Sequence, residues 1–344
     1  MAFSFPASPS IGTEYVSPVG ILYIWDGTWT TMGDTQTNNP FLDTFLYRSI
    51  YTHGYVSGGY KNSSPWKNTN KTDHATDITT NLGDRLDYAA GYVHGGYSDY
   101  NFYVYGVTDS FQAASTYTTS VAMTTETTRA HSSAWDLKTS RYYQPTVFMN
   151  STLTTIYITG GAGDGSTDKH NTVTDVMYAA GTCASRSGSG SHSGGCYGEQ
   201  KGWFRSSNSS EVITYATDTW ATWGQFTGTE GVNKGHSTKH GFGYLHAGNN
   251  VSTATYTKFS DITGTIISAT MVDPNGACGE ENHETGQNHG YYLGQYNGAQ
   301  NNVTTKFNYL TDTCTAMGSD TQPKGHDGMS SGANASASRY MLGL

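Results

Sequence analysis

The sequence predicts an all-β fold, and the prediction rests on two observations of composition. The 344 residues include 42 Gly, 26 Tyr, 12 Phe and 7 Trp, while only 13% of the chain is charged. Aromatic and β-branched side chains suit the pleated surface of a strand, and Gly supplies the dihedral angles of tight turns. Disordered chains usually combine a high net charge with few aromatic residues. We therefore expect many short strands joined by turns.

An internal repeat predicts how the strands are grouped. An aromatic residue followed three positions later by Gly, Ala or Ser recurs at Tyr55, Tyr92, Tyr157, Trp203, Tyr244, Tyr291 and Tyr340. These positions are 37 to 65 residues apart. Recurrence at such intervals indicates a repeat architecture in which each unit buries its faces against its neighbours. We expect each unit to be a four-stranded blade. Residues 20–344 are then a single seven-bladed β-propeller domain, and residues 1–19 are an N-terminal arm.

A second phrase, a hydroxyl residue followed by Asp, accompanies six of the seven units. It occurs at Thr76-Asp77, Thr108-Asp109, Thr174-Asp175, Thr217-Asp218, Ser260-Asp261 and Thr311-Asp312. The seventh unit, at Tyr340, has no Asp after it. The opening stretch "ILYIWDGTWTTMGDTQ" contains Asp26 and matches "FNYLTDTCTAMGSDTQ" at 307–322. This predicts that N-terminal strands at 20–34 complete the C-terminal blade by pairing with residues 338–344.

These phrases resemble the kelch type of propeller. The match is good at "YVSGGY" (55–60) and "YATDTWATW" (215–223), and it is weaker in the fourth, sixth and seventh units, which lack the Gly pair. The resemblance implies a kelch-like blade, with an inner strand ending in Gly-Gly and a turn that contains Asp and Thr. The longest interval falls in 110–155. That segment is interpreted either as the outer strands of one blade plus the start of the next, or as an inserted hairpin.

Longer stretches resemble structural proteins of tailed phages that infect cyanobacteria. They are "THGYVSGGYKNSSPWKNTNKTDHATDITTNLGDRLDYAAGYVHGGYSDYNFYVYG" (52–106) and "YLTDTCTAMGSDTQPKGHDGMSSG" (309–332). The resemblance implies a virion protein of the phage tail or its appendages, such as a tail fibre, that becomes extracellular on release. Its expected partners are other tail proteins in a symmetric multi-copy assembly and, for host attachment, a host-surface glycan or protein. It transfers no catalytic residue.

Two groups of recurrent residues are candidate sites. "THGY", "KHGF" and "NHGY" place His53, His240 and His289 just before three expected inner strands, where imidazoles could bind a transition metal. The alternative is a recurring turn, which we favour, so no metal or cofactor is expected. The Thr-Asp pairs occur once per unit rather than facing each other across one pocket, which favours turn caps over catalytic carboxylates.

Surface recognition is the remaining candidate role. Tyr60, Trp66 and Tyr97 follow expected inner strands, and exposed aromatic residues on loops stack well on sugars and proteins. Ordinary packing within a blade is the alternative. Host binding is expected on the loops at 60–70 and 162–171.

Charge and sequence patterning limit the partners and the compartment. A formal net charge of -9 with no basic run argues against nucleic acid. No stretch approaches the roughly 20 apolar residues of a membrane span, and "MAFSFPASPS" does not read as a signal peptide. Cys183 and Cys196 flank a Gly/Ser-rich loop, which a disulfide could close; both could equally be thiols.

Two functions therefore remain. One is a non-enzymatic virion protein, which we favour. The other is a secreted propeller that binds carbohydrate or acts as a copper oxidase of the galactose-oxidase type. That oxidase chemistry needs a cross-linked Tyr-Cys pair, a further Tyr and two His, and no motif here singles them out.

Overall fold

The computed structural model describes the chain between residues 14 and 335, with gaps. The described residues are 14–16, 22–25, 29–31, 53–61, 64–89, 94–98, 101–106, 115–141, 145–150, 154–160, 165–183, 194–197, 200–206, 209–224, 236–239, 242–246, 255–260, 262–272, 282–285, 289–293, 304–309, 311–317 and 333–335.

Most of the described strands form six antiparallel sheets of four strands each. Sheet 1 has the order β29 (Ala333–Ala335), β4 (His53–Ser57), β7 (Asn68–Asp73) and β8 (Ile78–Asp84). Sheet 2 consists of β9 (His94–Tyr97), β10 (Asn101–Tyr105), β11 (Thr118–Ala122) and β12 (Thr127–Thr128). Sheet 3 consists of β13 (Thr146–Met149), β14 (Thr155–Thr159), β15 (Ser166–Asn171) and β16 (Val176–Thr182).

The other three sheets have the same order of first to fourth strand along the chain. Sheet 4 consists of β17 (Gly194–Tyr197), β18 (Lys201–Ser206), β19 (Ser209–Thr214) and β20 (Thr219–Thr222). Sheet 5 consists of β21 (His236–Lys239), β22 (Phe242–His246), β23 (Thr255–Ser260) and β24 (Ile266–Val272). Sheet 6 consists of β25 (Asn282–Thr285), β26 (His289–Leu293), β27 (Thr304–Asn308) and β28 (Thr313–Ala316).

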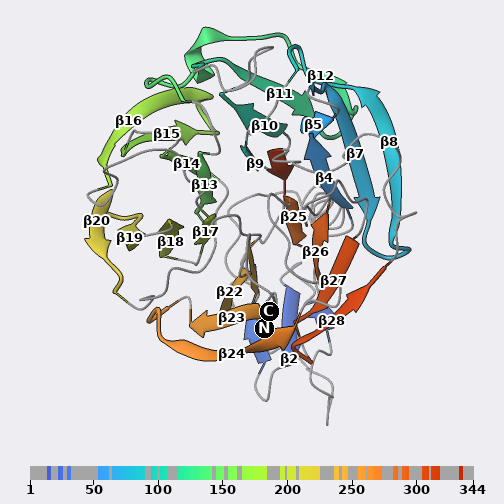
Figure 1. Ribbon diagram of the computed structural model, residues 1–344, viewed down its shortest axis with the longest axis vertical. Helices are drawn as coiled ribbons and strands as arrows, with labels where there is room; N and C mark the ends of the chain where they lie inside the picture. Colours follow the sequence, from blue (N-terminus) through green and yellow to red (C-terminus); the bar gives the residue numbers. More distant parts are fainter. Residues whose placement is uncertain are drawn as a thin grey trace, which may run out of the picture.

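The six sheets are arranged around a common centre (Figure 1). The first strands face this centre, and each contacts the first strand of the next sheet in the order β29, β9, β13, β17, β21, β25. β25 in turn contacts β29. The all-β prediction is confirmed, and the described residues contain no α-helix.

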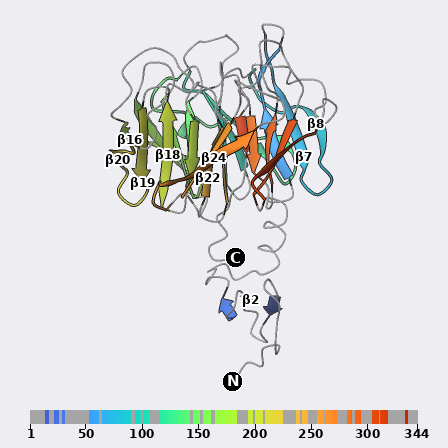
Figure 2. The same ribbon diagram turned by 60° about the horizontal axis from the view of Figure 1, so that its bottom comes forward.

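The predicted number and closure of the units need correction. The described chain has six four-stranded sheets rather than seven, and β2 (Leu22–Trp25) pairs with β1 (Glu14–Val16) and β3 (Trp29–Thr31). This three-stranded sheet lies outside the ring (Figure 2) and spans the predicted boundary at 19/20. It is β29 that pairs with β4, while residues 338–344 and Asp26 lie outside the described residues. Strands joined by short connections pair locally at a low entropic cost, which explains why 22–25 pairs with its neighbours.

The overcount arose because two similar phrases belong to different strands. In sheet 2 the aromatic position is Tyr103, which pairs with Ser120 as Tyr55 pairs with Lys71. Tyr92 lies outside the described residues, and the Gly pair after it belongs to the first strand, β9. A Cβ on Gly96 would lie 2.8 Å from Ile156 Cγ2, so this Gly permits close packing against sheet 3.

With Tyr103 in place of Tyr92, six equivalent aromatic residues lie in the second strands, one per sheet. They are Tyr55, Tyr103, Tyr157, Trp203, Tyr244 and Tyr291, and all are buried. The apolar core lies between neighbouring sheets. Its largest cluster extends from Tyr55 in sheet 1 through sheets 2, 3 and 4, and smaller clusters lie between sheets 4 and 5, 5 and 6, and 6 and 1. Burial of apolar surface between neighbours is therefore the main force holding the ring together.

Each third strand passes to the fourth through a turn with one residue in the left-handed conformation. These residues are Asp77, Glu126, Asp175, Asp218, Gly264 and Asp312, with φ between 53 and 76°. Gly adopts this region without strain and Asp is enriched there, which explains the recurrent Asp. The predicted turn role is confirmed at Asp77, Asp175, Asp218 and Asp312. Asp109 and Asp261 lie outside the described residues, and Glu126 and Gly264 occupy the equivalent positions.

The segment that allowed two interpretations contains strands of two sheets. Residues 118–128 complete sheet 2, and β13 begins sheet 3, so an inserted hairpin is not needed. Between them lies a short 3-10 helix, Ser133–Trp135, with Ser132 as its N-cap. A small hairpin of β5 (Tyr60–Lys61) and β6 (Ser64–Pro65) follows β4. Among the described residues, no helix is long and apolar enough to span a bilayer.

Candidate functional site

The strand register places a lysine beside the aromatic residue in four of the six sheets. The cross-strand pairs are Tyr55 with Lys71, Tyr157 with Lys169, Tyr244 with Lys258 and Tyr291 with Lys306. Directly opposed residues share one face of a sheet. Each lysine Nζ lies 5.4 to 5.8 Å from the centroid of its tyrosine ring, a cation–π geometry. Each pair thus presents an ammonium group and a phenol together.

The acceptor for each pair is the left-handed turn residue of the next sheet. Tyr157 Oη donates to Asp218 Oδ1 at 2.7 Å, and Lys169 Nζ donates to Asp218 Oδ2 at 2.8 Å. At the joint between sheets 5 and 6, Lys258 Nζ lies 2.8 Å from Asp312 Oδ2. Hydrogen bonds to charged groups are the stronger class of protein hydrogen bond. The turn residue therefore links two sheets as well as shaping its own turn.

The same contact joins the last sheet to the first. Tyr291 Oη donates to Asp77 Oδ1 at 2.7 Å, and Lys306 Nζ donates to Asp77 Oδ2 at 2.6 Å. Burial raises the pKa of the Asp77 carboxyl, but the hydrogen bonds from Lys306 and Tyr291 outweigh burial and leave this pKa below its ordinary value. Between sheets 1 and 2, Lys71 Nζ donates to Glu126 Oε1 at 2.5 Å.

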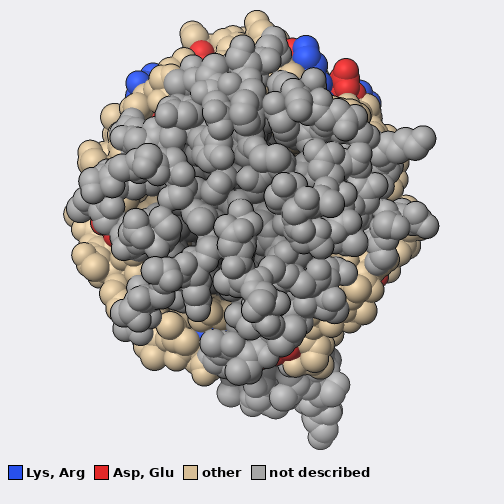
Figure 3. All heavy atoms as spheres, viewed as in Figure 1, with Lys and Arg blue, Asp and Glu red and all other residues tan. Residues whose placement is uncertain are grey.

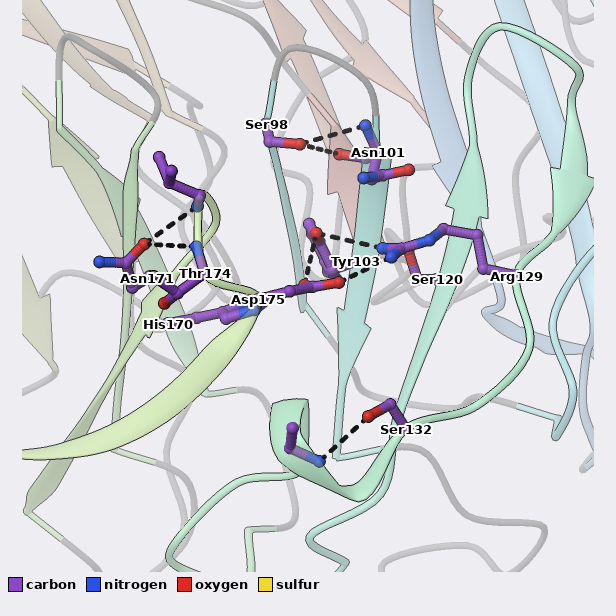
Figure 4. A network of polar contacts seen from close by, with 12 residues as sticks. Ser98, Asn101, Tyr103, Ser120, Arg129, Ser132, His170, Asn171, Thr174 and Asp175 are labelled. Carbon is purple, nitrogen blue, oxygen red and sulfur yellow. Dashed lines mark hydrogen bonds and ion pairs between the residues drawn. The ribbon is translucent and has the colours of Figure 1, made fainter.

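The joint between sheets 2 and 3 uses an arginine (Figure 4). Ser120 occupies the position of the lysine, and Arg129 reaches the turn from beyond β12. Its Nη2 donates to Asp175 Oδ2 at 2.6 Å, while Tyr103 Oη donates to Asp175 Oδ1 at 2.9 Å. Burial raises the pKa of Asp175, but hydrogen bonds from His170, Arg129 and Tyr103 lower it to about 2.

His170 extends this network into the core. Its Nε2 lies 3.1 Å from Asp175 Oδ1, and its Nδ1 lies 2.9 Å from Tyr105 Oη. Because the Asp175 carboxylate can only accept, Nε2 is the donor, and Nδ1 then accepts the hydroxyl proton of Tyr105. Burial raises the pKa of Tyr105 well above its ordinary value. Tyr105 and His170 are fully buried, whereas the Asp175 side chain is 30% exposed, so only the carboxylate end of this Tyr–His–Asp chain reaches the surface.

The joint between sheets 4 and 5 has no ion pair of this kind. Trp203 takes the place of the tyrosine and Val212, opposite it, takes that of the lysine. Gly264 takes the place of the acid, and a Cβ there would lie 2.5 Å from the Trp203 ring. Trp223 Nε1 donates to the Gly264 carbonyl at 2.9 Å. An indole packed on a bare backbone turn replaces the charged contact.

Two further polar pairs are buried near the joints. Arg141, after sheet 2, donates to the carbonyl of Gly160 at 2.6 Å and to Asp168 Oδ2 at 3.2 Å, and both side chains are almost fully buried. Burial raises the pKa of Asp168 despite the opposing effect of Arg141. The Cys183 thiol donates to the buried carboxylate of Glu211. Cys183 is thus a thiol and forms no disulfide with Cys196.

The three predicted recognition residues do not share one surface. Trp66 is half-buried, and its backbone N–H donates to the carbonyl of Gly59 at 3.0 Å. Tyr60 follows the end of β4, whereas Tyr97 pairs with Phe102 near the start of β10. Because β4 and β10 are equivalent second strands, Tyr60 and Tyr97 lie at opposite ends of their sheets. Their side chains lie outside the described part of the structure.

The histidines were expected just before the innermost strands, and that placement is wrong. His53 and His289 begin β4 and β26, which are second strands, while the first strands face the centre. His53 Nε2 lies 3.9 Å from Asp73 Oδ2. His240 lies outside the described residues. In the described ranges, no group of three or more His, Cys, Asp and Glu side chains could hold a metal ion.

Sequence reasoning identified the acids of this network but missed the cations. A usable signal was present, since the third-strand residue opposite the buried aromatic residue precedes the turn residue of its own sheet by six positions in every sheet, as Lys71 precedes Asp77.

The comparison with protein families found no family model that matches the chain, and the comparison with curated proteins found no match.

Proposed function

We propose that the six sheets are the blades of one β-propeller and that the protein is a non-enzymatic structural subunit of a tailed cyanophage virion, located in the tail or an appendage. In this proposal the propeller is six-bladed and kelch-like, and it is closed at the joint between sheets 6 and 1. The sequence resemblances described above support the virion assignment.

The observation that carries the proposal is the repeated contact between sheets. The recurrent acids that could have served as catalysts are held by a lysine or arginine of the preceding sheet, at Asp77, Glu126, Asp175, Asp218 and Asp312. At Asp77 and Asp175 the cation and the phenol lower the pKa of the carboxyl, which makes these two carboxylates poor general bases. The network therefore favours a structural role, in which the acids join neighbouring sheets into a rigid ring.

Surface composition supports assembly into a larger particle. Only 13% of the chain is charged. Among the described residues visible in Figure 3, most are neither Lys and Arg nor Asp and Glu. Charged residues are depleted in the centres of protein interfaces. We propose tail proteins as the principal partners. Host attachment is proposed for the loops that follow the second strands, which include Tyr60 and Trp66.

The test is to locate the protein. Purified particles should contain the chain at a fixed stoichiometry, and an electron-microscopy map should show a six-bladed ring ordered in the tail. The same protein should be purified in parallel from the same host and assayed for bound copper and for oxidase activity. A secreted monomer with stoichiometric copper and oxidase activity would replace the proposal with the enzymatic alternative.

A further inference from the structure

A cluster of aromatic rings lies on the surface where sheets 1 and 2 meet. Tyr88 follows β8 of sheet 1, and Tyr117 directly precedes β11 of sheet 2. Their rings meet edge to face, with centroids 4.6 Å apart. The Tyr117 ring in turn stacks on the imidazole of His131, at 4.2 Å and an interplanar angle of 12°. Tyr88 is 42% exposed, so it presents part of its ring to solvent while the stack behind holds it in place.

Two charged side chains lie beside the Tyr88 ring. Lys67 Nζ lies 5.9 Å from the centroid of this ring and donates to the backbone carbonyl of Asp87 at 2.8 Å. The Asp87 carboxylate accepts from Tyr117 Oη at 3.3 Å. Burial and the neighbouring Asp87 carboxylate raise the pKa of Tyr117 to about 12, so its hydroxyl remains a donor at neutral pH. An exposed ring, an ammonium group and a carboxylate are thus neighbours on one surface.

The polar groups of this cluster have hydrogen-bonding capacity left over. Within the described part of the chain, Lys67 Nζ makes one hydrogen bond although an ammonium group can donate three. The Asp87 carboxylate accepts through one of its two oxygens. His131 uses Nε2, which lies 3.0 Å from Asp136 Oδ1, and its Nδ1 has no partner among the described residues. The cluster can therefore donate to a polar ligand and accept from it without losing its own contacts.

The end of the ring that carries the acidic turns does not offer this combination. Both carboxylate oxygens of Asp77 accept hydrogen bonds, and so do both oxygens of Asp218. Tyr178, close to the turn of sheet 3, is 48% exposed, but its side chain makes no ring contact or hydrogen bond with other described residues. An exposed tyrosine alone is therefore not the distinguishing feature of the Tyr88 surface. The distinguishing feature is a ring held in place beside a donor and an acceptor with free capacity.

We propose that Tyr88, Asp87 and Lys67 bind a sugar ring of a cell-surface glycan. A pyranose has a face of C–H groups that packs on an aromatic ring, and its hydroxyl groups both donate and accept hydrogen bonds. The sugar stacks on the exposed part of Tyr88, donates to the Asp87 carboxylate and accepts from the Lys67 ammonium group. This inference rests on the host attachment proposed above and names its ligand. It places the site next to the 60–70 loop, because Lys67 directly follows Trp66.

The size and the charge of the surface favour a neutral sugar over a protein or a nucleic acid. A ring exposed to this extent offers on the order of 100 Å², whereas a stable protein interface needs roughly 800 Å² from each partner. One ammonium group and one carboxylate beside the ring leave no net positive charge for a phosphate backbone. A contact of this size predicts a dissociation constant on the order of 1 mM for one site. Many copies on one particle bind far more tightly through avidity.

An array of bacterial surface oligosaccharides tests the inference. The biotinylated full chain is displayed in many copies on fluorescent streptavidin beads, because the affinity of one site is low. We expect the beads to bind at least one neutral oligosaccharide of the array. Saturation-transfer-difference NMR of the soluble chain with that oligosaccharide should give the strongest signals on the C–H protons of one pyranose face. Beads that bind no oligosaccharide would overturn the inference, and so would signals spread evenly over the ligand.

Substitutions locate the bound sugar. Tyr88→Ala removes the stacking ring and should weaken binding about tenfold or more, whereas Tyr88→Phe keeps the ring and should change binding less than about threefold. Asp87→Asn keeps an acceptor for Tyr117 but removes the charge, and it should weaken binding roughly fivefold. Tyr178→Ala, at an equally exposed tyrosine outside the site, is the matched control and should leave binding unchanged. Urea unfolding of each variant separates a loss of binding from a loss of fold.

The outcomes separate the inference from the proposed function. Glycan binding that survives both Tyr88→Ala and Asp87→Asn in the folded protein would place the sugar elsewhere and overturn the inference. If the binding depends on Tyr88 but the chain is absent from purified particles, the inference stands and the virion assignment fails. If the ring is ordered in the tail but the beads bind only protein receptors, the assignment stands and the inference fails.

Discussion

Replacing Asp77 by Asn tests whether sheets 6 and 1 are joined as firmly as sheets in the interior of the sequence. Asp77 accepts from Tyr291 at 2.7 Å and from Lys306 at 2.6 Å. Asn keeps the size of the side chain and, like Asp, tolerates the left-handed conformation at φ 59°. The variant therefore removes the charge and leaves the turn intact.

The expected loss is set by the partly exposed setting of the contact. The side chains of Lys306 and Asp77 are 21% and 31% exposed. A hydrogen bond to a charged group contributes about 1.5–3 kcal/mol, and an exposed ion pair contributes roughly 0–1 kcal/mol. An intermediate loss of about 2 kcal/mol in the free energy of unfolding is expected. Urea unfolding followed by circular dichroism measures it directly.

Asp218→Asn is the matched control, because the joint between sheets 3 and 4 has the same geometry. Tyr157 and Lys169 donate to Asp218 at 2.7 and 2.8 Å. If the ring is closed, the two variants should lose similar free energies, to within about 0.5 kcal/mol. A full loss for Asp218→Asn with no measurable loss for Asp77→Asn would refute closure at sheets 6 and 1.

Three further predictions concern individual joints. The pKa of Asp175 is about 2 in the folded protein and about 3.9 when unfolded, so its contribution to the free energy of unfolding is present above pH 4 and is lost as the pH falls toward 2. Asp175→Asn should therefore flatten the pH dependence of the stability in urea between pH 4 and pH 2, and an unchanged slope would contradict the network. Gly264→Ala should lower the free energy of unfolding by about 3 kcal/mol or more, because its Cβ meets two indole rings. Gly224→Ala, with φ 69° and open space around the added Cβ, should lower it by about 1 kcal/mol in the same assay, and equal losses would count against the packing argument. Arg141→Met should cost about 3–5 kcal/mol by leaving Asp168 buried without its cation, and adding Asp168→Asn should recover part of the loss; a double variant no more stable than the single one would show that the charge is not the cause.

The local features of the fold could be predicted from the sequence because they depend on neighbouring residues. The turn acids were predicted because the left-handed conformation restricts the residue types that a turn accepts, and Asp175 and Asp218 follow that rule. The count of units was wrong because the phrase around Tyr92 matches the one around Tyr55 in letters, although its Gly pair lies in a first strand. A phrase of five residues does not record which strand it belongs to.

The contacts between sheets were harder to predict because they join residues far apart in the sequence. Lys306 and Asp77 are separated by 229 residues, and only the ring arrangement brings them together. The constant spacing of six lies within one sheet, as from Lys306 to Asp312, so it marks the two positions in each repeat but does not show which sheets are paired. The pairing of β29 with β4 has no such signal, since Ala333–Ala335 contains no aromatic or charged residue.

The apolar joint between sheets 4 and 5 has a consequence for how the chain folds. A ring of similar repeats joined by similar contacts could assemble in a shifted order, or could exchange a repeat with another molecule. Trp203 fits only a turn without a side chain, and Gly264 offers no carboxylate to a Tyr–Lys pair. Any misplaced neighbour would therefore press an indole against an acid and leave a partly buried ammonium group without its counter-ion. One uncharged joint is sufficient to make the order of the repeats unique, and so to disfavour domain-swapped oligomers during synthesis.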